Sequence, residues 1–231
     1  MSSPGPTQDF WQTRFIDHAT PWDRGVANPQ LVSWVRAGIL RPVAGADGRV
    51  SGSDDPRVRR ILVTGCGSGH EVAMLAEWGF DVTAVDFAPA ALEQTRNRLR
   101  RLLQGGAERL VRAELIEHDL LTFDPPGQFD AIYEQACLCS LYPDNWVRYG
   151  ENLRRWLKPG GQLYALFLQM MRPAASQGVI EGPPYHCDIN AMRAVFPNAW
   201  WEWPKPPYDR LPHPAAAAEL PVILTRRATA G

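Results

Sequence analysis

A short β-branched run that breaks into a glycine-rich turn constrains this chain more than any other feature. Residues 61–69 read Ile-Leu-Val-Thr-Gly-Cys-Gly-Ser-Gly, and a second apolar run over 81–86 ends at Asp86. Glycine allows a sharp turn and a close approach of the backbone to a ligand, because it has no Cβ. An acid about 20 residues further on is placed to accept hydrogen bonds from ribose hydroxyls. The pattern predicts a strand–turn–helix unit that binds a nucleoside-containing ligand.

The spacing of the glycines narrows the choice of nucleoside. Gly65, Gly67 and Gly69 give G-x-G-x-G, and His70 stands where the dinucleotide fingerprint has its third glycine. No Lys-Ser or Lys-Thr pair follows, which excludes a P-loop. A glycine loop without a phosphate-binding helix start favours a ligand without phosphates, so we predict S-adenosylmethionine (SAM) as the cofactor. The alternative is a glycine turn in an ordinary α/β protein, with Asp86 in solvent.

The order of predicted elements indicates the fold class. Strands alternate with helices through the middle of the chain, which predicts a doubly wound, mostly parallel α/β sheet of the Rossmann-like type. We expect a single domain over residues 1–231, in which residues 8–40 form a helical lid. Strands are predicted at 61–65, 81–86, 110–116, 129–133, 162–168 and 220–225. Helices are predicted at 9–19, 29–37, 69–78, 89–103, 144–157 and 188–196, with a loop over 41–59.

Composition excludes several classes of protein. The chain has 231 residues, 45% of them hydrophobic, and a net charge of −1, so no general nucleic-acid surface is expected. No apolar run reaches the length of a membrane span, and the N-terminus lacks the features of a signal peptide, which favours a cytoplasmic protein. The four cysteines have no zinc-type spacing, so we expect buried, reduced thiols and no metal site. They are Cys66, Cys137, Cys139 and Cys187.

The carboxyl ends of the predicted strands locate the site. In an open parallel sheet, ligands bind at this edge. The segments expected there are Gly65–Gly69, Asp86-Phe87, His118–Leu120 and Glu134–Ser140. Asp119 is placed to accept a hydrogen bond from an adenine amino group, although a cap or turn role is the alternative. The aromatic residues before the sheet either cover it or form a lid, because aromatic faces attract a sulfonium and exclude water. They are Trp11, Phe15 and Trp22.

Several motifs in this order carry a family resemblance. They are Phe10-Trp11, Pro21-Trp22-Asp23, Gly65–Gly69, Asp86, residues 132–136, Leu157-Lys-Pro-Gly-Gly161 and Gly182-Pro-Pro-Tyr185. Together they resemble the thiopurine S-methyltransferase-like family, which includes thiopurine, thiol and halide/thiocyanate methyltransferases. The resemblance covers residues 10–190 and implies the class I fold of SAM-dependent methyltransferases.

Nine residues are candidate contacts of SAM: the resemblance implies seven of them, and Gly67 and Phe87 follow from their positions after the first two predicted strands. Trp11 and Trp22 match aromatic residues that close over the cofactor, and Asp86 matches the acid on the ribose. Asp119 and Leu120 match the pair that flanks adenine. The remaining four are the loop glycines Gly65 and Gly67, Phe87 after Asp86, and Gln135 beside the methionine moiety, where relatives carry Tyr or Arg. Phe15 and Glu181 depart from the family pattern on the substrate side, so the acceptor's identity does not carry over.

The implied chemistry is methyl transfer to the sulfur of a small thiol or a related soft nucleophile. A thiolate is already a strong nucleophile and a sulfonium is an activated methyl donor, so in-line placement in a dry site suffices. If a general base is used, Glu134, Tyr185 and His186 are the candidates. The alternatives are an O- or N-methyltransferase on the same fold, or a non-catalytic SAM-binding protein. We expect a small-molecule acceptor as the partner and a monomer or weak homo-oligomer.

Overall fold

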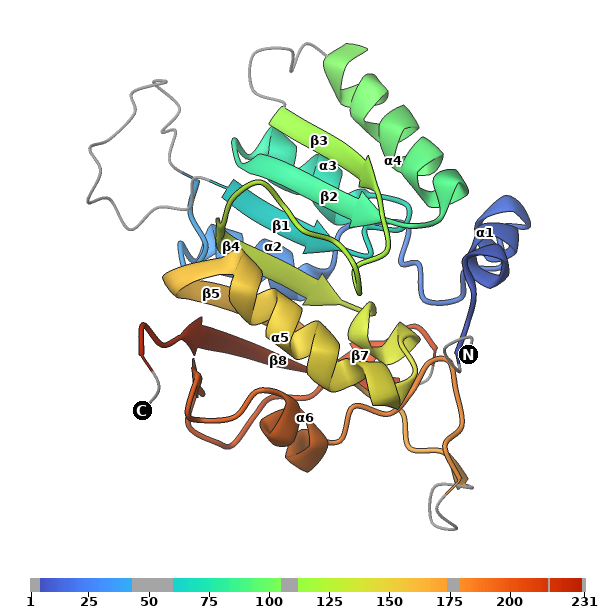
Figure 1. The fold of residues 1–231 in the computed structure, drawn as a ribbon. Coiled ribbons are helices and arrows are strands. Elements are labelled where there is room, and N and C mark those ends of the chain that lie inside the picture. Colours follow the sequence, from blue (N-terminus) through green and yellow to red (C-terminus); the bar gives the residue numbers. More distant parts are fainter. Residues whose placement is uncertain (1–4, 43–59, 105–111, 174–178, 216, 230–231) are drawn as a thin grey trace.

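One mixed β-sheet organises the fold. The computed structural model describes residues 5–42, 60–104, 112–173, 179–215 and 217–229. Within them, an eight-stranded sheet has the order β3-β2-β1-β4-β5-β8-β6, and β7 pairs with β8 (Figure 1). The strands are β1 Arg60–Thr64, β2 Asp81–Asp86, β3 Arg112–Glu117, β4 Phe129–Gln135, β5 Leu157–Gln169, β6 Trp201–Glu202, β7 Leu211–His213 and β8 Ala217–Arg226.

Strand direction brings the sequence motifs to one edge. The strands β1 to β5 are parallel, whereas β8 runs antiparallel to β5, β6 and β7. The carboxyl ends of the parallel strands therefore meet along a single edge, where the arrowheads point in Figure 1. This arrangement confirms the prediction of a doubly wound, mostly parallel α/β fold.

Alternating side chains build a core on each face of the sheet. In β1, Ile61 and Val63 belong to one core cluster and Leu62 to the other, as expected when successive residues of a strand point to opposite faces. The first cluster contains apolar residues of α2 Pro29–Arg36, α3 His70–Glu77 and α4 Pro89–Leu102. The second contains those of α5 Trp146–Trp156 and α6 Ile189–Val195. Helices therefore cover both faces of the sheet (Figure 1).

Local sequence explains where the helices begin and end. The Asn28 side chain caps α2 by accepting a hydrogen bond from the Gln30 amide, and Pro29 occupies the first turn, where its missing N–H costs nothing. In α3, Val72, Leu75 and Ala76 are buried, as their spacing predicts. Gly79 follows this helix in a left-handed conformation with φ 91°.

The first predicted helix is shorter than expected. Helix α1 spans Gln8–Ile16 and ends at Asp17, and His18 has a positive φ of 54°. Phe15 is buried, whereas Ile16, next to it in the helix, is 59% exposed. The chain leaves the helix before Thr20-Pro21 because the left-handed residue at position 18 already ends it.

The proposed lid region has two parts with different surroundings. Leu31, Trp34 and Val35 of α2 are buried in the sheet core, and the Trp34 ring packs edge-on against Tyr164. Helix α1 instead packs against α4 at the end of the molecule (Figure 1). The single domain and the lid over residues 8–40 stay predictions.

The C-terminal third contains more strand than its sequence suggested. Strand β5 begins at Leu157 rather than at 162, because Leu157 pairs with Phe129 before the register shifts. The last strand covers 217–226 rather than 220–225, and the short strands β6 and β7 lie in the proline-rich stretch where none was predicted. Pro221 pairs with Leu166 of β5, between the parts of β8 that β7 and β6 contact, so its missing donor is tolerated.

Some predictions fall on residues outside the described ranges. Most of the predicted loop over 41–59 and the first residues of the strand predicted at 110–116 are among them; the described part of that strand is β3. None of the helices in the described ranges combines the length and the apolar character needed to cross a bilayer. All four cysteines are buried and free, as predicted.

Candidate functional site

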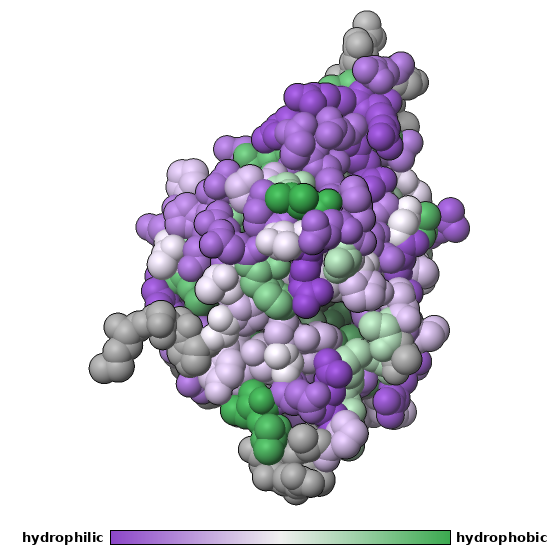
Figure 2. Space-filling view, turned by 90° about the vertical axis from the view of Figure 1, so that its right-hand side faces the viewer, coloured by the Kyte–Doolittle hydropathy of each residue, from purple (hydrophilic) through white to green (hydrophobic). Residues whose placement is uncertain are grey.

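One cavity lies at the carboxyl edge of the sheet. Its floor comes from residues at the ends of β1, β2, β4 and β5, and its walls come from the N-terminal segment, Pro183-Pro184 and β7. Figure 2 looks onto this side of the molecule, where weakly polar and hydrophobic residues gather towards the middle of a largely hydrophilic face. A cavity in this place agrees with the expectation for an open parallel sheet.

All nine residues that were predicted from the sequence as SAM contacts line this cavity. They are Trp11, Trp22, Gly65, Gly67, Asp86, Phe87, Asp119, Leu120 and Gln135. They come from the N-terminal segment and from the ends of β1, β2, β3 and β4, so the fold brings together residues that are far apart in the sequence. We call the part formed by Gly65, Gly67, Asp86, Phe87, Asp119 and Leu120 the glycine-loop end.

Backbone geometry explains the glycines of this loop. Gly65 and Gly69 have φ values of 56° and 77°, which only glycine adopts readily. A Cβ on Gly69 would lie 2.4 Å from Oγ1 of Thr95, and one on Gly65 would lie 3.0 Å from Cβ of Cys137. The Thr95 hydroxyl donates a hydrogen bond to the Gly67 carbonyl at 2.8 Å. Thr95 of α4 therefore holds the loop in place, and the backbone of Gly65 and Gly67 lines the cavity.

Asp86 is held by backbone donors. Its Oδ2 accepts from the Gly67 amide and its Oδ1 from the Ala88 amide, both at 2.9 Å. The residue is only 7% exposed, and burial raises the pKa of its carboxyl group although these amides oppose the rise. Each carboxylate oxygen can accept a second hydrogen bond, so Asp86 can still bind a pair of hydroxyls in the cavity.

Asp119 makes a turn interaction and also borders the cavity; its contact with adenine stays a prediction. Its Oδ1 accepts from the Leu121 amide at 2.9 Å, which is a turn interaction, and the residue also lines the cavity. Leu120 beside it is 7% exposed and packs in the core.

Aromatic rings cover the glycine-loop end. The Trp11 and Trp22 rings meet edge-on with centroids 5.5 Å apart, and Phe15 lies 6.2 Å from Trp22. Hydrogen bonds attach α1 to α4: Gln12 Oε1 accepts from the Ala90 amide at 2.9 Å, and Gln94 Nε2 donates to the Phe15 carbonyl at 3.0 Å. These hydrogen bonds hold α1, and with it Trp11 and Phe15, against the rim of the cavity.

Asp23 connects the N-terminal segment to the glycine loop. Its carboxylate accepts from the Ser68 hydroxyl and lies 2.9 Å from Nε2 of His70. Burial raises the pKa of Asp23, but the hydrogen bonds from Ser68 and Gly25 and the nearby charges outweigh burial, so the pKa is lowered. Burial and the neighbouring Arg98 lower the pKa of His70. His70 occupies the position at which the dinucleotide fingerprint has its third glycine. There it contacts Asp23 and so helps to join the N-terminal segment to the loop.

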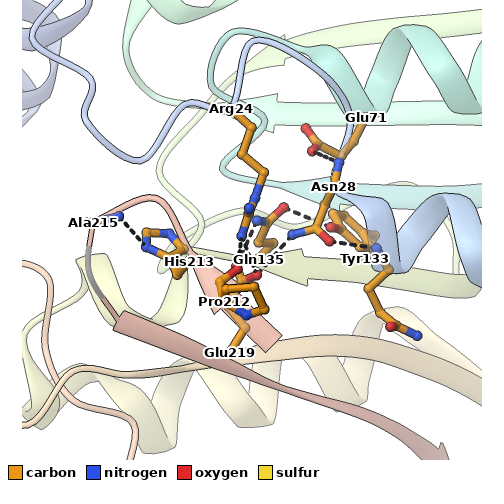
Figure 3. Close-up of polar contacts among 10 residues, drawn as sticks. Arg24, Asn28, Glu71, Tyr133, Gln135, Pro212, His213, Ala215 and Glu219 are labelled. Carbon is orange, nitrogen blue, oxygen red and sulfur yellow. Dashed lines mark hydrogen bonds and ion pairs between the residues drawn. The ribbon is translucent and has the colours of Figure 1, made fainter. Parts of the chain in front are cut away.

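A second polar cluster lies beside the cavity, which Arg24 and Gln135 line. Arg24 Nη2 donates to Glu219 Oε2 and to the Pro212 carbonyl, both at 2.9 Å (Figure 3). Gln135 Nε2 donates to Glu219 Oε1 at 2.9 Å, and Asn28 Nδ2 donates to Glu219 Oε2 at 3.1 Å. Glu219 is only 2% exposed, so these donors compensate a buried carboxylate.

Two further cavity residues belong to this region. Glu71 accepts from the Asn28 amide at 2.9 Å, and burial raises the pKa of its carboxyl group. His213 of β7 lines the cavity beside Arg24 and is 8% exposed. We call the part of the cavity formed by this cluster and its apolar neighbours the Arg24 end. Its lining is Arg24, Glu71, Gln135, Cys137, Cys139, Ser140, Leu141, Leu168, Pro183, Pro184 and His213.

None of the three candidate bases lines the cavity. Glu134 is 1% exposed, accepts from the Leu138 amide at 2.7 Å, and burial raises its pKa to about 7. Tyr185 is 6% exposed, and its ring packs edge-on against Tyr142. His186 is also absent from the lining, and its Nδ1 is buried without a hydrogen-bond partner among the described residues.

The sequence analysis missed Arg24, Glu71, His213 and Glu219. Glu219 carried the clearest signal, because it is a single charge inside an otherwise apolar run over 215–224. His213 had none, since it lies between two prolines in a stretch without periodicity. Within the described residues, no group of three or more His, Cys, Asp or Glu side chains could hold a metal ion.

Known structures share this architecture. The Burkholderia thailandensis 1,6-didemethyltoxoflavin-N1-methyltransferase, solved with S-adenosylhomocysteine bound, superposes with a TM-score of 0.65. It is 17% identical, and the match covers 98% of this chain and 93% of that one. At this identity the match establishes the fold, which is the Rossmann-like fold of class I SAM-dependent methyltransferases.

Sequence comparisons identify the family. Thiocyanate methyltransferase 1 of Arabidopsis thaliana is 26% identical over 186 residues, which cover 80% of this chain and 70% of the relative. Thiopurine S-methyltransferase of Methylococcus capsulatus is 26% identical over 203 residues, covering 83% and 82%. The family model for thiopurine S-methyltransferase matches residues 6–211. The chain belongs to the thiopurine S-methyltransferase family and is a SAM-dependent methyltransferase.

Proposed function

We propose that the protein methylates the sulfur of a small thiol, with the glycine-loop end and Gln135 binding SAM and the rest of the Arg24 end binding the acceptor. The observation that carries this proposal is that both ends belong to one cavity. A nucleoside-binding loop and a largely apolar recess therefore open onto the same space. When bound, SAM supplies a methyl group activated by a sulfonium.

The residues of the glycine-loop end fit an adenosine. Asp86 retains hydrogen-bonding capacity on both carboxylate oxygens, which suits the two hydroxyls of a ribose. Gly65 and Gly67 leave the loop backbone open, since no Cβ projects into the cavity. Leu120 and Phe87 offer apolar surface for the adenine ring, and Asp119 offers an acceptor for its amino group.

Trp11, Phe15 and Trp22 exclude water and attract positive charge. Aromatic faces stabilise a cation most when water is absent. We propose that residues 8–25 form the lid of the enzyme and become more ordered when the cavity is filled. Gln12 and Gln94, which attach α1 to α4, hold this segment close to the cavity.

The Arg24 end suits an uncharged apolar thiol. Cys139, Leu141, Leu168 and Pro183 offer little polarity to an acceptor. The nearby guanidinium of Arg24 is already neutralised by Glu219. Burial raises the pKa of the Cys137 and Cys139 thiols well above the usual value, so these side chains stay protonated and are poor nucleophiles.

Sulfur as the accepting atom is supported by the family and by the absence of Glu134, Tyr185 and His186 from the lining. A thiolate needs only placement beside the methyl group, whereas an alcohol requires a base to become nucleophilic. The cytoplasmic location and the monomeric or weakly oligomeric state stay predictions.

A panel of acceptors tests the proposal. Purified protein is incubated with SAM and with matched thiols, phenols and amines, and the products are identified by mass spectrometry. We expect methylated thiols, formed by the wild-type protein and by the surface variant Asp124→Ala but much more slowly by Asp86→Ala. Methylation of a phenol or amine alone would instead establish an O- or N-methyltransferase. Tight SAM binding without any product would establish a non-catalytic binding protein.

A further inference from the structure

His213 is the cavity residue whose chemistry neither the family match nor the sequence analysis assigned. It ends β7, where it pairs with Ala217 of β8, and only 8% of its surface is exposed. Its imidazole belongs to the Arg24 end, and the charges of Glu219 and Arg24 act on it (Figure 3). A buried imidazole on the wall of a reaction cavity can donate or accept a proton, so its protonation state decides what it can do.

The hydrogen bond of one ring nitrogen fixes this state. The Ala215 amide donates to Nδ1 of His213 at 3.2 Å. A nitrogen that accepts an N–H carries no proton, so a neutral ring must carry its proton on Nε2. Burial lowers the pKa of His213; the carboxylate of Glu219 opposes this effect and the guanidinium of Arg24 adds to it. The imidazole is therefore neutral at neutral pH, with Nε2 as a donor.

The charged groups around His213 already have partners. Arg24, from the N-terminal segment, and Glu219, from β8, pair with each other at 2.9 Å. Glu219 also accepts from Gln135 and Asn28, so it has three donors among the described side chains. None of the residues that the structure describes accepts a hydrogen bond from Nε2 of His213. Because His213 lines the cavity, Nε2 is available to donate to a molecule bound there.

We infer that His213 donates its Nε2–H to the sulfur of the methyl acceptor and thereby favours the thiolate form in the site. This inference rests on the proposed function. The acceptor's proton leaves to water before transfer; the thiolate sulfur then forms a bond to the methyl carbon as the sulfonium carbon–sulfur bond breaks, and the leaving sulfur keeps the electron pair. His213 keeps its own proton throughout, so it acts as a donor and not as a general base.

The donor role predicts a specific pattern across variants. A glutamine side chain places an N–H close to the position of Nε2 but cannot act as a base, whereas leucine offers neither. We expect His213→Gln to keep kcat/KM within a few-fold of wild type. For an alkyl thiol with a pKa of about 8.5, His213→Leu should lose roughly 10- to 100-fold at pH 7, the effect of one hydrogen bond to a charged group.

A pH profile separates this role from a merely structural one. The rate rises with pH as the bound thiol ionises, and we expect the rising limb to move to higher pH in His213→Leu but not in His213→Gln. An aryl thiol that is already ionised at neutral pH serves as the comparison and should show a smaller loss. Melting temperature and calorimetric binding of S-adenosylhomocysteine report whether each variant is folded. If His213→Leu does not fold, His213→Ala replaces it.

Each result decides the question. Equal losses in His213→Gln and His213→Leu would overturn the donor role. Unchanged activity and unchanged profiles in both variants would overturn the inference while leaving the proposed function intact. A wild-type protein that is inert towards every thiol would overturn the proposed function itself, whatever the variants do.

Discussion

The two ends of the cavity are built in opposite ways. At the glycine-loop end, Asp86 is satisfied by backbone amides of residues 67 and 88, and the residues that define this end lie between positions 65 and 120. At the Arg24 end, the buried carboxylate of Glu219 is satisfied by side chains at positions 24, 28 and 135. Local backbone geometry supports one end, and long-range side-chain contacts support the other.

This difference has a physical consequence for mutation. A backbone donor remains when a side chain is truncated, so the glycine-loop end retains its shape when a residue other than its glycines is altered. The Arg24 end depends on charges that compensate one another in a buried place, and loss of one partner leaves the other uncompensated. Variants at the Arg24 end should therefore affect folding first, and variants at the glycine-loop end should affect binding first.

The largest effect is expected from Arg24→Met. This change leaves the carboxylate of Glu219, which is 2% exposed, without its cationic partner. We expect a loss of about 3–5 kcal/mol in the free energy of unfolding, measured by urea denaturation. Arg96→Met is the matched control, because its partner Glu93 is 51% exposed, and it should lose less than about 1 kcal/mol. Equal losses of unfolding free energy in the two variants would show that the buried ion pair is no more important for stability than the exposed one.

A pH-dependent effect is expected at Glu134, which supports the turn carrying Cys137 and Cys139. Burial raises the pKa of Glu134 to about 7, so the folded protein holds this proton more tightly than the unfolded chain does. Stability should therefore fall as the pH rises from about 4 through 7, by roughly 2–4 kcal/mol for this group. Glu134→Gln should flatten this part of the profile, whereas the exposed control Glu151→Gln should not. A profile of Glu134→Gln that superposes on that of wild type would refute the assignment.

Asp86→Ala tests the glycine-loop end. Loss of the acceptor for two ribose hydroxyls should weaken binding of S-adenosylhomocysteine by about 1–3 kcal/mol, roughly 10- to 100-fold, measured by calorimetry. Asp86→Asn keeps one acceptor oxygen and should fall between this variant and wild type. Asp144→Ala, on the surface, should bind normally. A folded Asp86→Ala protein with unchanged affinity would exclude the ribose contact.

The smallest effect should be the response of the lid. Addition of S-adenosylhomocysteine should slow hydrogen exchange of residues 8–25, because Trp11 and Trp22 then gain contacts at the glycine-loop end. Helix α5 lies on the opposite face of the sheet and provides an internal control. Equal exchange of residues 8–25 with and without ligand would assign these aromatic residues to a permanent cover.

The comparison also explains which features could be predicted from sequence. Gly65 directly follows β1 and Asp86 ends β2, so their closeness at one edge follows from the βαβ order alone. The pairing of Arg24 with Glu219 spans almost the whole chain and depends on the antiparallel insertion of β8 beside β5. No local pattern encodes that contact. Strand β7 was missed for a related reason, since His213 lies between two prolines and is recruited to the sheet only by tertiary pairing with β8.

Asp23 and Arg24 are adjacent in the chain, yet one contacts the glycine loop and the other contacts β8. A single peptide unit therefore joins the two walls of the cavity. Any movement that admits or releases the cofactor also disturbs the wall against which the acceptor would rest. We expect a compulsory kinetic order, with the cofactor binding before the acceptor and the methylated product departing before the spent cofactor. Product-inhibition patterns in steady-state kinetics would reveal this order.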